Sequence, residues 1–141
     1  MTLWVVDASV IIKWYVPEND YAAARAMRTA EIELAAPDLL FVEMSNILWK
    51  LVRRREMESM RAIEIIEEVA TSPFITFSTQ SLARDALELG IATGLSAYDA
   101  SYVALAIRLN TPLITADEKL VRKVAGTHAA NHVTLLANHT N

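Results

Sequence analysis

Short apolar runs that end in a polar residue alternate along this chain with longer amphipathic stretches. The first run, residues 3–6, is followed by Asp7 and then by a second apolar segment that begins at Ala8. A short apolar run is typical of a buried strand, and a longer segment with apolar residues three and four apart is typical of a helix. Repeated alternation of the two predicts a mainly parallel sheet covered by helices. We therefore expect a three-layer α/β/α fold with a central, mainly parallel sheet of about five strands.

The same reading gives approximate limits for each element. Pro17 and Gly94 mark two helix ends, because proline interrupts a helix and glycine is favoured just after one. Right-handed crossovers place the carboxyl ends of consecutive parallel strands at one edge of the sheet. Strands are expected at residues 3–6, 34–36, 73–77, 113–115 and 132–136, and helices at 8–15, 21–32, 37–55, 57–71, 81–93, 96–109 and 117–125.

Composition limits the class of protein. With 141 residues, 53% of them apolar, the chain has the size of one domain over residues 1–141. It has no Cys, which excludes disulfides, thiolate nucleophiles and cysteine zinc sites and fits a reducing cytoplasm. No apolar run approaches the roughly 18 residues of a membrane span, so we expect a soluble, cytoplasmic protein without a membrane partner. A net charge of -4 argues against a broad basic surface for nucleic acid but allows a local basic patch.

Four acidic residues occupy positions where chemistry is common in such folds. Asp7 and Asp117 each follow a predicted strand, so both should face the crevice at the carboxyl edge of the sheet. Glu43 lies within the apolar run of the longest helix, where an unpartnered charge would be costly to bury. Asp99 lies one turn into a helix that is otherwise nearly all apolar. We expect these four side chains to meet at one point.

Each acid also has a purely structural interpretation. Ser96 with Asp99, and Thr115 with Glu118, match the spacing of a capping box. The acid between Thr115 and Glu118 would then be a first-turn residue that favours the helix dipole. Asp7 is an acceptable N-cap for the helix that follows it, and the acid of the long helix could lie at a half-exposed rim.

Capping alone does not explain why small hydroxyl residues accompany the strand-end acids. Ser9 lies two residues after Asp7, and Thr115 lies two residues before Asp117. A hydroxyl beside a carboxylate can orient it. A set of ligands made only of oxygen atoms suits a hard cation such as Mg²⁺ or Mn²⁺. Without the ion, the carboxylates would repel one another and the pKa of some would rise.

Four segments in fixed order resemble the acidic motifs of a known family. They read VVDASV, PDLLFVEMSNILWK, LSAYDASYVALA and LITADEKL, and they span Val5 to Leu120. This ordered set is similar to the motifs of PIN-domain ribonucleases, and more narrowly of the VapC toxins of type II toxin-antitoxin pairs. The resemblance implies a PIN-like fold and a metal-dependent endoribonuclease, with transfer RNA or another structured RNA as substrate. It also implies a homodimer and a VapB-like antitoxin as partner.

The resemblance assigns roles to individual residues. It implies that the four acids, Asp7, Glu43, Asp99 and Asp117, are catalytic and hold one or two Mg²⁺ or Mn²⁺ ions. It implies that Ser9, Asn46 and Thr115 support that site. One segment departs from the family, which commonly has a glycine near a basic pair after the long helix, where this chain reads RRREMES.

Basic residues that could hold RNA are few. Arg53 and Arg54 belong to the densest basic run, with Lys50 one turn earlier, and Lys13 precedes two aromatic residues near the predicted crevice. We expect these four to contact substrate. The alternative is a solvated helix end, since cations are favourable at a helix C-terminus.

Two other functions fit acids at the edge of a parallel sheet. The first is a phosphotransfer domain, either a phosphatase or a receiver. An aspartyl phosphatase usually has a second acid at the position that Ser9 occupies here. A receiver usually has a lysine after a strand near the crevice, and residues 113–116 contain none. A catalytically silent RNA-binding PIN module is the other. Homodimerisation is also expected from the apolar helix at 96–109.

Overall fold

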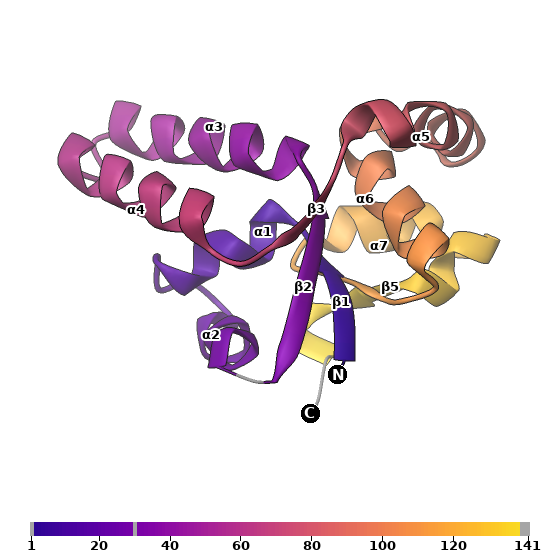
Figure 1. Cartoon of the computed structure of the whole chain (residues 1–141), viewed down its shortest axis with the longest axis horizontal. Coiled ribbons are helices and arrows are strands. Elements are labelled where there is room, and N and C mark those ends of the chain that lie inside the picture. The colour runs from indigo at the N-terminus through magenta and orange to yellow at the C-terminus, as the bar shows by residue number, and fades with distance from the viewer. Residues whose placement is uncertain (1, 30, 139–141) are drawn as a thin grey trace.

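The computed structural model describes residues 2–29 and 31–138, and its centre is a sheet of five parallel strands (Figure 1). The strands lie in the order β3-β2-β1-β4-β5. All four neighbouring pairs are parallel, as expected from the alternation of strand and helix. Their bounds are β1 Thr2–Val6, β2 Ile32–Pro37, β3 Ile75–Phe77, β4 Leu113–Thr115 and β5 Val133–Leu135.

Helices cover both faces of this sheet. In Figure 1, α1 to α4 lie to the left of the strands and α5 to α7 lie to the right, which gives the expected three layers. The bounds are α1 Ala8–Ile11, α2 Tyr21–Thr29, α3 Leu39–Arg53, α4 Ser59–Thr71, α5 Thr79–Thr93, α6 Ala97–Leu109 and α7 Glu118–Val124. Short 3₁₀ turns occupy Ile12–Trp14, His128–His132 and Leu136–Asn138. Within the described ranges, no helix combines the length and the apolar character needed to cross a bilayer.

Several predicted boundaries are wrong by a few residues, most clearly those of α2 and β2. The expected helix at 21–32 ends at Thr29, and the strand expected at 34–36 begins earlier, at Ile32. Ile32 is paired with Thr2 of β1, and Leu34 with Trp4. Hydrogen bonding with β1 therefore places Ile32 and Leu34 in the sheet. The helical periodicity of the sequence alone would extend α2 to residue 32.

Helix α6 lies at the centre of the fold. It contacts β1, β2, β4 and α5, and residues 100–106 are all buried. This helix is apolar on nearly every side because protein surrounds it. The apolar surface of α6 is used within the chain, so the reason given above for expecting a dimer is wrong.

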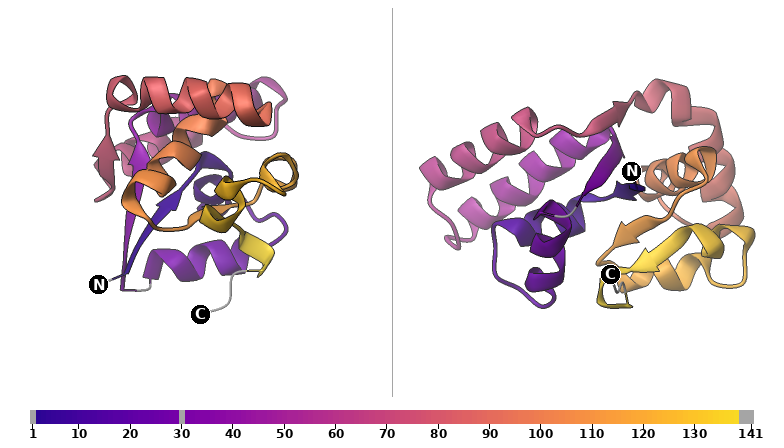
Figure 2. Two further views of the ribbon diagram at one scale, coloured as in Figure 1. Left: turned by 90° about the vertical axis from the view of Figure 1, so that its right-hand side faces the viewer. Right: turned by 60° about the horizontal axis from the view of Figure 1, so that its bottom comes forward.

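Helices α3 and α4 pack side by side and project beyond the sheet (Figures 1 and 2). Helix α3 ends in a Schellman motif, in which the Glu56 N–H donates to the Leu51 carbonyl at 2.8 Å and the Arg55 N–H donates to the Val52 carbonyl at 3.0 Å. Arg55 has a φ of 59°, a left-handed conformation in which glycine is usual. The absence of the family's glycine thus leaves the turn intact, with an arginine in a strained position.

Candidate active site

The register of two central strands brings the first hydroxyl and acid together. Val6 of β1 is paired with Ile114 of β4, so the residues that follow, Asp7 and Thr115, lie side by side at the carboxyl edge. Thr115 is fully buried, and Asp7 is 7% exposed. Asp7 is also the N-cap of α1, because its Oδ1 accepts a hydrogen bond from the Ser9 N–H at 3.1 Å. Capping and membership of an acidic cluster are therefore compatible.

Two hydroxyl groups hold the Asp7 carboxylate between them. Ser9 Oγ donates to Oδ1 at 2.5 Å, and Thr115 Oγ1 donates to Oδ2 at 2.6 Å. Each hydroxyl in turn accepts a backbone N–H, from Ala116 at 2.9 Å and from Asp117 at 3.1 Å. Because a hydroxyl has a single proton, accepting the N–H leaves that proton to point at Asp7. The orientation of Asp7 is therefore set by both β1 and β4.

Asp117 begins α7, but not in the way that the capping-box spacing suggests. Its Oδ1 accepts from the N–H groups of Lys119, at 2.9 Å, and Leu120, at 3.3 Å, so Asp117 is itself the N-cap. The capping box that the spacing of Thr115 and Glu118 suggests does not form. Thr115 is the last residue of β4, and its hydroxyl donates to Asp7.

The other predicted cap is present at α6. Ser96 Oγ accepts from the Asp99 N–H at 3.2 Å, which places Asp99 in the first turn of the helix. The Asp99 carboxylate is half-buried. Helix α6 contacts β1 and β4, whose ends provide the first and fourth acids.

Glu43 lies in the first half of α3 and is half-buried. Its Oε1 is buried and makes no hydrogen bond within the part of the chain that the structure describes. The Tyr102 hydroxyl of α6 is near enough for each group to alter the pKa of the other, but the contact is not a hydrogen bond of normal geometry. Asn46, one turn after Glu43, is exposed.

Electrostatics show that the four acids share one region. Burial raises the pKa of Asp7 to about 6; hydrogen bonds from the two hydroxyls oppose this rise, and Asp99 and Asp117 add to it. Burial also raises the pKa of Glu43, with further increases from Asp7 and Asp99. The pKa of Asp99 is raised by burial and then by Asp117, and lowered by Lys123. Burial and nearby like charges therefore oppose the ionisation of Asp7, Glu43 and Asp99.

The ligand atoms at this edge suit a hard divalent cation. They are carboxylate oxygens, and Glu43 contributes a buried oxygen that has no hydrogen-bond partner among the described residues. Among the residues that the structure describes, no group of three acidic or histidine side chains is arranged so that all three could bind one ion directly. Mg²⁺ commonly keeps several waters and uses only one or two carboxylates, so the residues present fit this ion.

Two residues near the acids were missed from the sequence. Tyr102 follows Asp99 by three positions and so lies on the same side of α6, a spacing that could have identified it. Lys123 of α7 lowers the pKa of Asp99, and its Nζ donates to the Gly94 carbonyl at 3.5 Å. Nothing in the local sequence connects Lys123 with Asp99, because the two come from different helices.

The four predicted substrate contacts lie in two different settings. Lys13 is buried in the turn after α1, and its Nζ forms an ion pair with Glu18 at 3.3 Å. The other three, Lys50, Arg53 and Arg54, are exposed at the end of α3. Together with Trp49 they line a hollow of about 320 Å³, and the Arg53 guanidinium lies 5.2 Å from the centre of the Trp49 ring.

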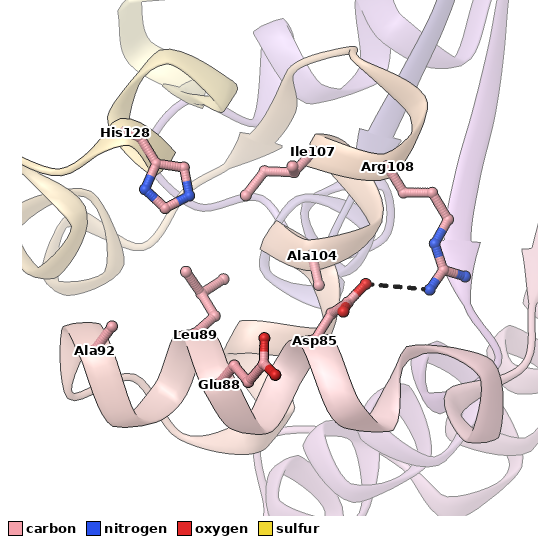
Figure 3. Close-up of a pocket in the computed structure, with 8 residues that line it drawn as sticks. All are labelled: Asp85, Glu88, Leu89, Ala92, Ala104, Ile107, Arg108 and His128. Carbon is pink, nitrogen blue, oxygen red and sulfur yellow. Dashed lines mark hydrogen bonds and ion pairs between the residues drawn. The ribbon is translucent and has the colours of Figure 1, made fainter.

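A larger groove, of about 510 Å³, lies between α5, α6 and the turn at His128 (Figure 3). Leu89, Ala104 and Ile107 give it apolar walls. Arg108 forms an ion pair with Asp85 at its edge, at 3.3 Å. None of the four acids lines this groove, so it is separate from the candidate active site.

Comparison with known proteins identifies the family. The PIN domain family matches residues 4–126. Ribonuclease VapC3 of Pyrobaculum aerophilum is 38% identical over 122 residues, which cover 84% of this chain and 92% of that protein. The crystal structure of PAE2754 from Pyrobaculum aerophilum is similar with a TM-score of 0.71 and 25% identity, covering 96% of this chain and 85% of that one. A chain from a toxin-antitoxin complex of Klebsiella pneumoniae has a TM-score of 0.63 at 18% identity, covers 96% and 98% of the two chains, and is alike in fold. This chain therefore belongs to the PIN-domain family and, within it, to the VapC ribonucleases.

Proposed function

We propose that this chain is a single PIN domain over residues 1–141 that hydrolyses RNA internally with the help of Mg²⁺ or Mn²⁺. The observation that carries the proposal is the convergence of four carboxylates, which follow β1 and β4 or lie on α3 and α6. The pKa values of three of them, Asp7, Glu43 and Asp99, are raised by burial and by the neighbouring acids. Such a cluster is stabilised by a cation. The ribonuclease name of the 38% identical relative supports RNA as the substrate.

Asp7 and Asp99 are the first choice as ligands for one or two ions, with Glu43 and Asp117 next. A bound ion lowers the pKa of a water nucleophile and stabilises negative charge on the phosphate. Ser9 and Thr115 keep the Asp7 carboxylate in one orientation through bonds of 2.5 and 2.6 Å. Asn46, exposed one turn after Glu43, would lie at the rim of the site.

The phosphotransfer alternative has less support. An aspartyl nucleophile needs an accessible oxygen, whereas Asp7 is 7% exposed and both of its oxygens accept hydrogen bonds. A carboxylate oxygen that accepts one hydrogen bond keeps a lone pair for a cation, so Asp7 can still bind an ion.

We place RNA binding at the exposed end of α3. Lys50, Arg53 and Arg54 offer positive charge to phosphates, and Trp49, 54% exposed, offers a ring for stacking with a base. RNA would engage Lys13 only after its ion pair with Glu18 opens.

We further propose a cytoplasmic toxin that acts on transfer RNA or another structured RNA and is restrained by a VapB-like antitoxin. The VapC name of the relative supports this role, and the Klebsiella pneumoniae complex shows that a chain of this fold occurs with an antitoxin. A homodimer is part of the proposal. Light scattering should give about twice the 15.7 kDa of one chain, and a monomer at micromolar concentration would contradict it.

Cleavage of end-labelled transfer RNA by the purified protein tests the proposed activity. Cleavage should require Mg²⁺ or Mn²⁺, stop with EDTA, and fall at least about a hundredfold in Asp7→Asn and in Asp99→Asn, because each loses a ligand charge. Asp85→Asn is the matched control, since Asp85 lies on α5 in an ion pair with Arg108. Circular dichroism checks that each variant is folded. Cleavage at the normal rate by either site variant would show that the site is wrongly assigned.

A further inference from the structure

Two buried oxygen atoms beside the acidic cluster lack a hydrogen-bond partner among residues 2–29 and 31–138. They are Oε1 of Glu43 on α3 and the hydroxyl of Tyr102 on α6. Tyr102 is 1% exposed, so water does not supply the missing partner from the surface. Buried polar groups are almost always satisfied in folded proteins, and each exception needs a physical reason.

The two unpartnered atoms belong to side chains that are close enough to affect each other's pKa. The Tyr102 hydroxyl acts on Glu43 as a hydrogen-bond donor would, lowering the pKa of Glu43, and Glu43 raises the pKa of Tyr102. Their contact nevertheless falls short of normal hydrogen-bond geometry. One hydrogen bond between them would satisfy both groups at once.

We propose that Tyr102 is a positioning residue for Glu43: its hydroxyl donates to one carboxylate oxygen and so directs the other toward the divalent ion. The inference rests on the proposed function, since it assumes that Glu43 helps to hold the ion. Hydrogen bonds to a ligating carboxylate fix its orientation and commonly affect metal affinity.

Three features favour Tyr102 for this task. It lies one turn after Asp99 on α6, so a single helix would set the positions of both Asp99 and Glu43. A tyrosine hydroxyl also carries a proton that it can donate to an ionised carboxylate such as Glu43. Finally, the hydroxyl has no competing partner in the described part of the chain.

Mn²⁺ binding without RNA tests the inference in Tyr102→Phe, which removes the hydroxyl and keeps the ring. Titration followed by electron paramagnetic resonance should give a Kd about tenfold weaker than that of the wild type. Tyr15→Phe is the matched control, because the Tyr15 hydroxyl is also buried without a partner but lies near Arg28 and Glu68. Its Mn²⁺ affinity should stay within about twofold of the wild type.

Two further measurements separate positioning from a structural role. The melting temperature of Tyr102→Phe in EDTA should equal or exceed that of the wild type, because the Tyr102 hydroxyl makes no hydrogen bond in the described part of the chain and is expected to donate to Glu43 only when the ion binds. At saturating Mn²⁺, kcat for RNA cleavage should fall while KM stays unchanged. A lower melting temperature together with unchanged Mn²⁺ affinity would make Tyr102 a structural residue and overturn the inference.

A double-variant cycle tests whether the effect of Tyr102 acts through Glu43. In a Glu43→Gln background, adding Tyr102→Phe should weaken Mn²⁺ binding less than twofold, since the carboxylate to be positioned is gone. A further tenfold loss in that background would contradict the inference and leave the proposed function standing. Failure of the wild type to bind Mn²⁺ would overturn both.

Discussion

At the scale of single residues, Asp7 carries the largest electrostatic cost in the site. Its pKa is raised from 3.8 to about 6, so the folded state binds the proton more tightly than the unfolded state. Above pH 6, the ionised carboxylate then lowers the free energy of unfolding by about 3 kcal/mol. The cost develops as the pH rises from about 4 to about 6 and is absent below that window.

Asp7→Asn should therefore stabilise the metal-free protein. In EDTA at pH 7.5 we expect the free energy of unfolding to rise by about 1 to 3 kcal/mol, because the amide carries no charge. The wild type should be more stable at pH 5 than at pH 7.5, and the variant should lose most of that difference. Urea unfolding at both pH values measures this. A wild type that gains stability between pH 5 and pH 7.5, with no gain from the substitution, would contradict the account.

Arg55 offers a second residue-scale prediction. Its left-handed φ of 59° costs a side chain about 1 kcal/mol and costs glycine almost nothing. Arg55→Gly should therefore stabilise the protein by about 0.5 to 1 kcal/mol, measured by thermal or urea unfolding. Arg54→Gly, at the preceding position with a φ of -82°, is the control and should give no such gain. Equal effects of the two would exclude strain at Arg55.

At the scale of elements, the placement of Asp7 and Asp117 at the same edge of the sheet could be predicted, because each follows a short apolar run in an alternating chain, whereas the adjacency of β1 and β4 could not. Details that depend on neighbours could not be predicted. Ile32 belongs to β2 because it pairs with Thr2. The Thr115 hydroxyl donates a hydrogen bond to Asp7 and does not cap α7. Lys13 resembled a substrate contact in sequence, but the fold buries it against Glu18.

The basic end of α3 is an element whose function can be tested apart from catalysis. Replacing Lys50, Arg53 and Arg54 together by Ala should weaken RNA binding in EDTA and reduce its dependence on salt, since fewer counterions are released. Each lost phosphate contact should lower the slope of log K against log salt by about 0.7 for single-stranded RNA. Fluorescence anisotropy with labelled RNA at several salt concentrations measures both effects.

Arg84 and Arg122 provide the matched control for that experiment. Both are exposed and form ion pairs with a glutamate four residues away on their own helix, so they resemble the basic residues of α3 in charge but not in place. Replacing them by Ala should leave the salt slope unchanged. If the control variant loses as much affinity as the α3 variant, net charge rather than the end of α3 governs binding.

At the scale of the whole molecule, the positions of the four acids could be anticipated, but the contacts between them could not. The ordered motifs point to Asp7, Glu43, Asp99 and Asp117 in one chain. The partners that tune these acids, Tyr102 and Lys123, come from packing of α6 and α7 that no local pattern records. The apolar character of α6 likewise reflects its central place in the fold and not an exposed surface.

We propose that oxygens from four distant segments form one site for a divalent cation. A crystal structure of the protein grown with Mn²⁺, with the ion located by its anomalous scattering, tests this proposal. We expect an anomalous peak among Asp7, Glu43, Asp99 and Asp117, bound directly by Asp7 or Asp99 and absent from crystals of Asp7→Asn. Mn²⁺ bound only elsewhere on the molecule, or an unchanged peak in that variant, would contradict it.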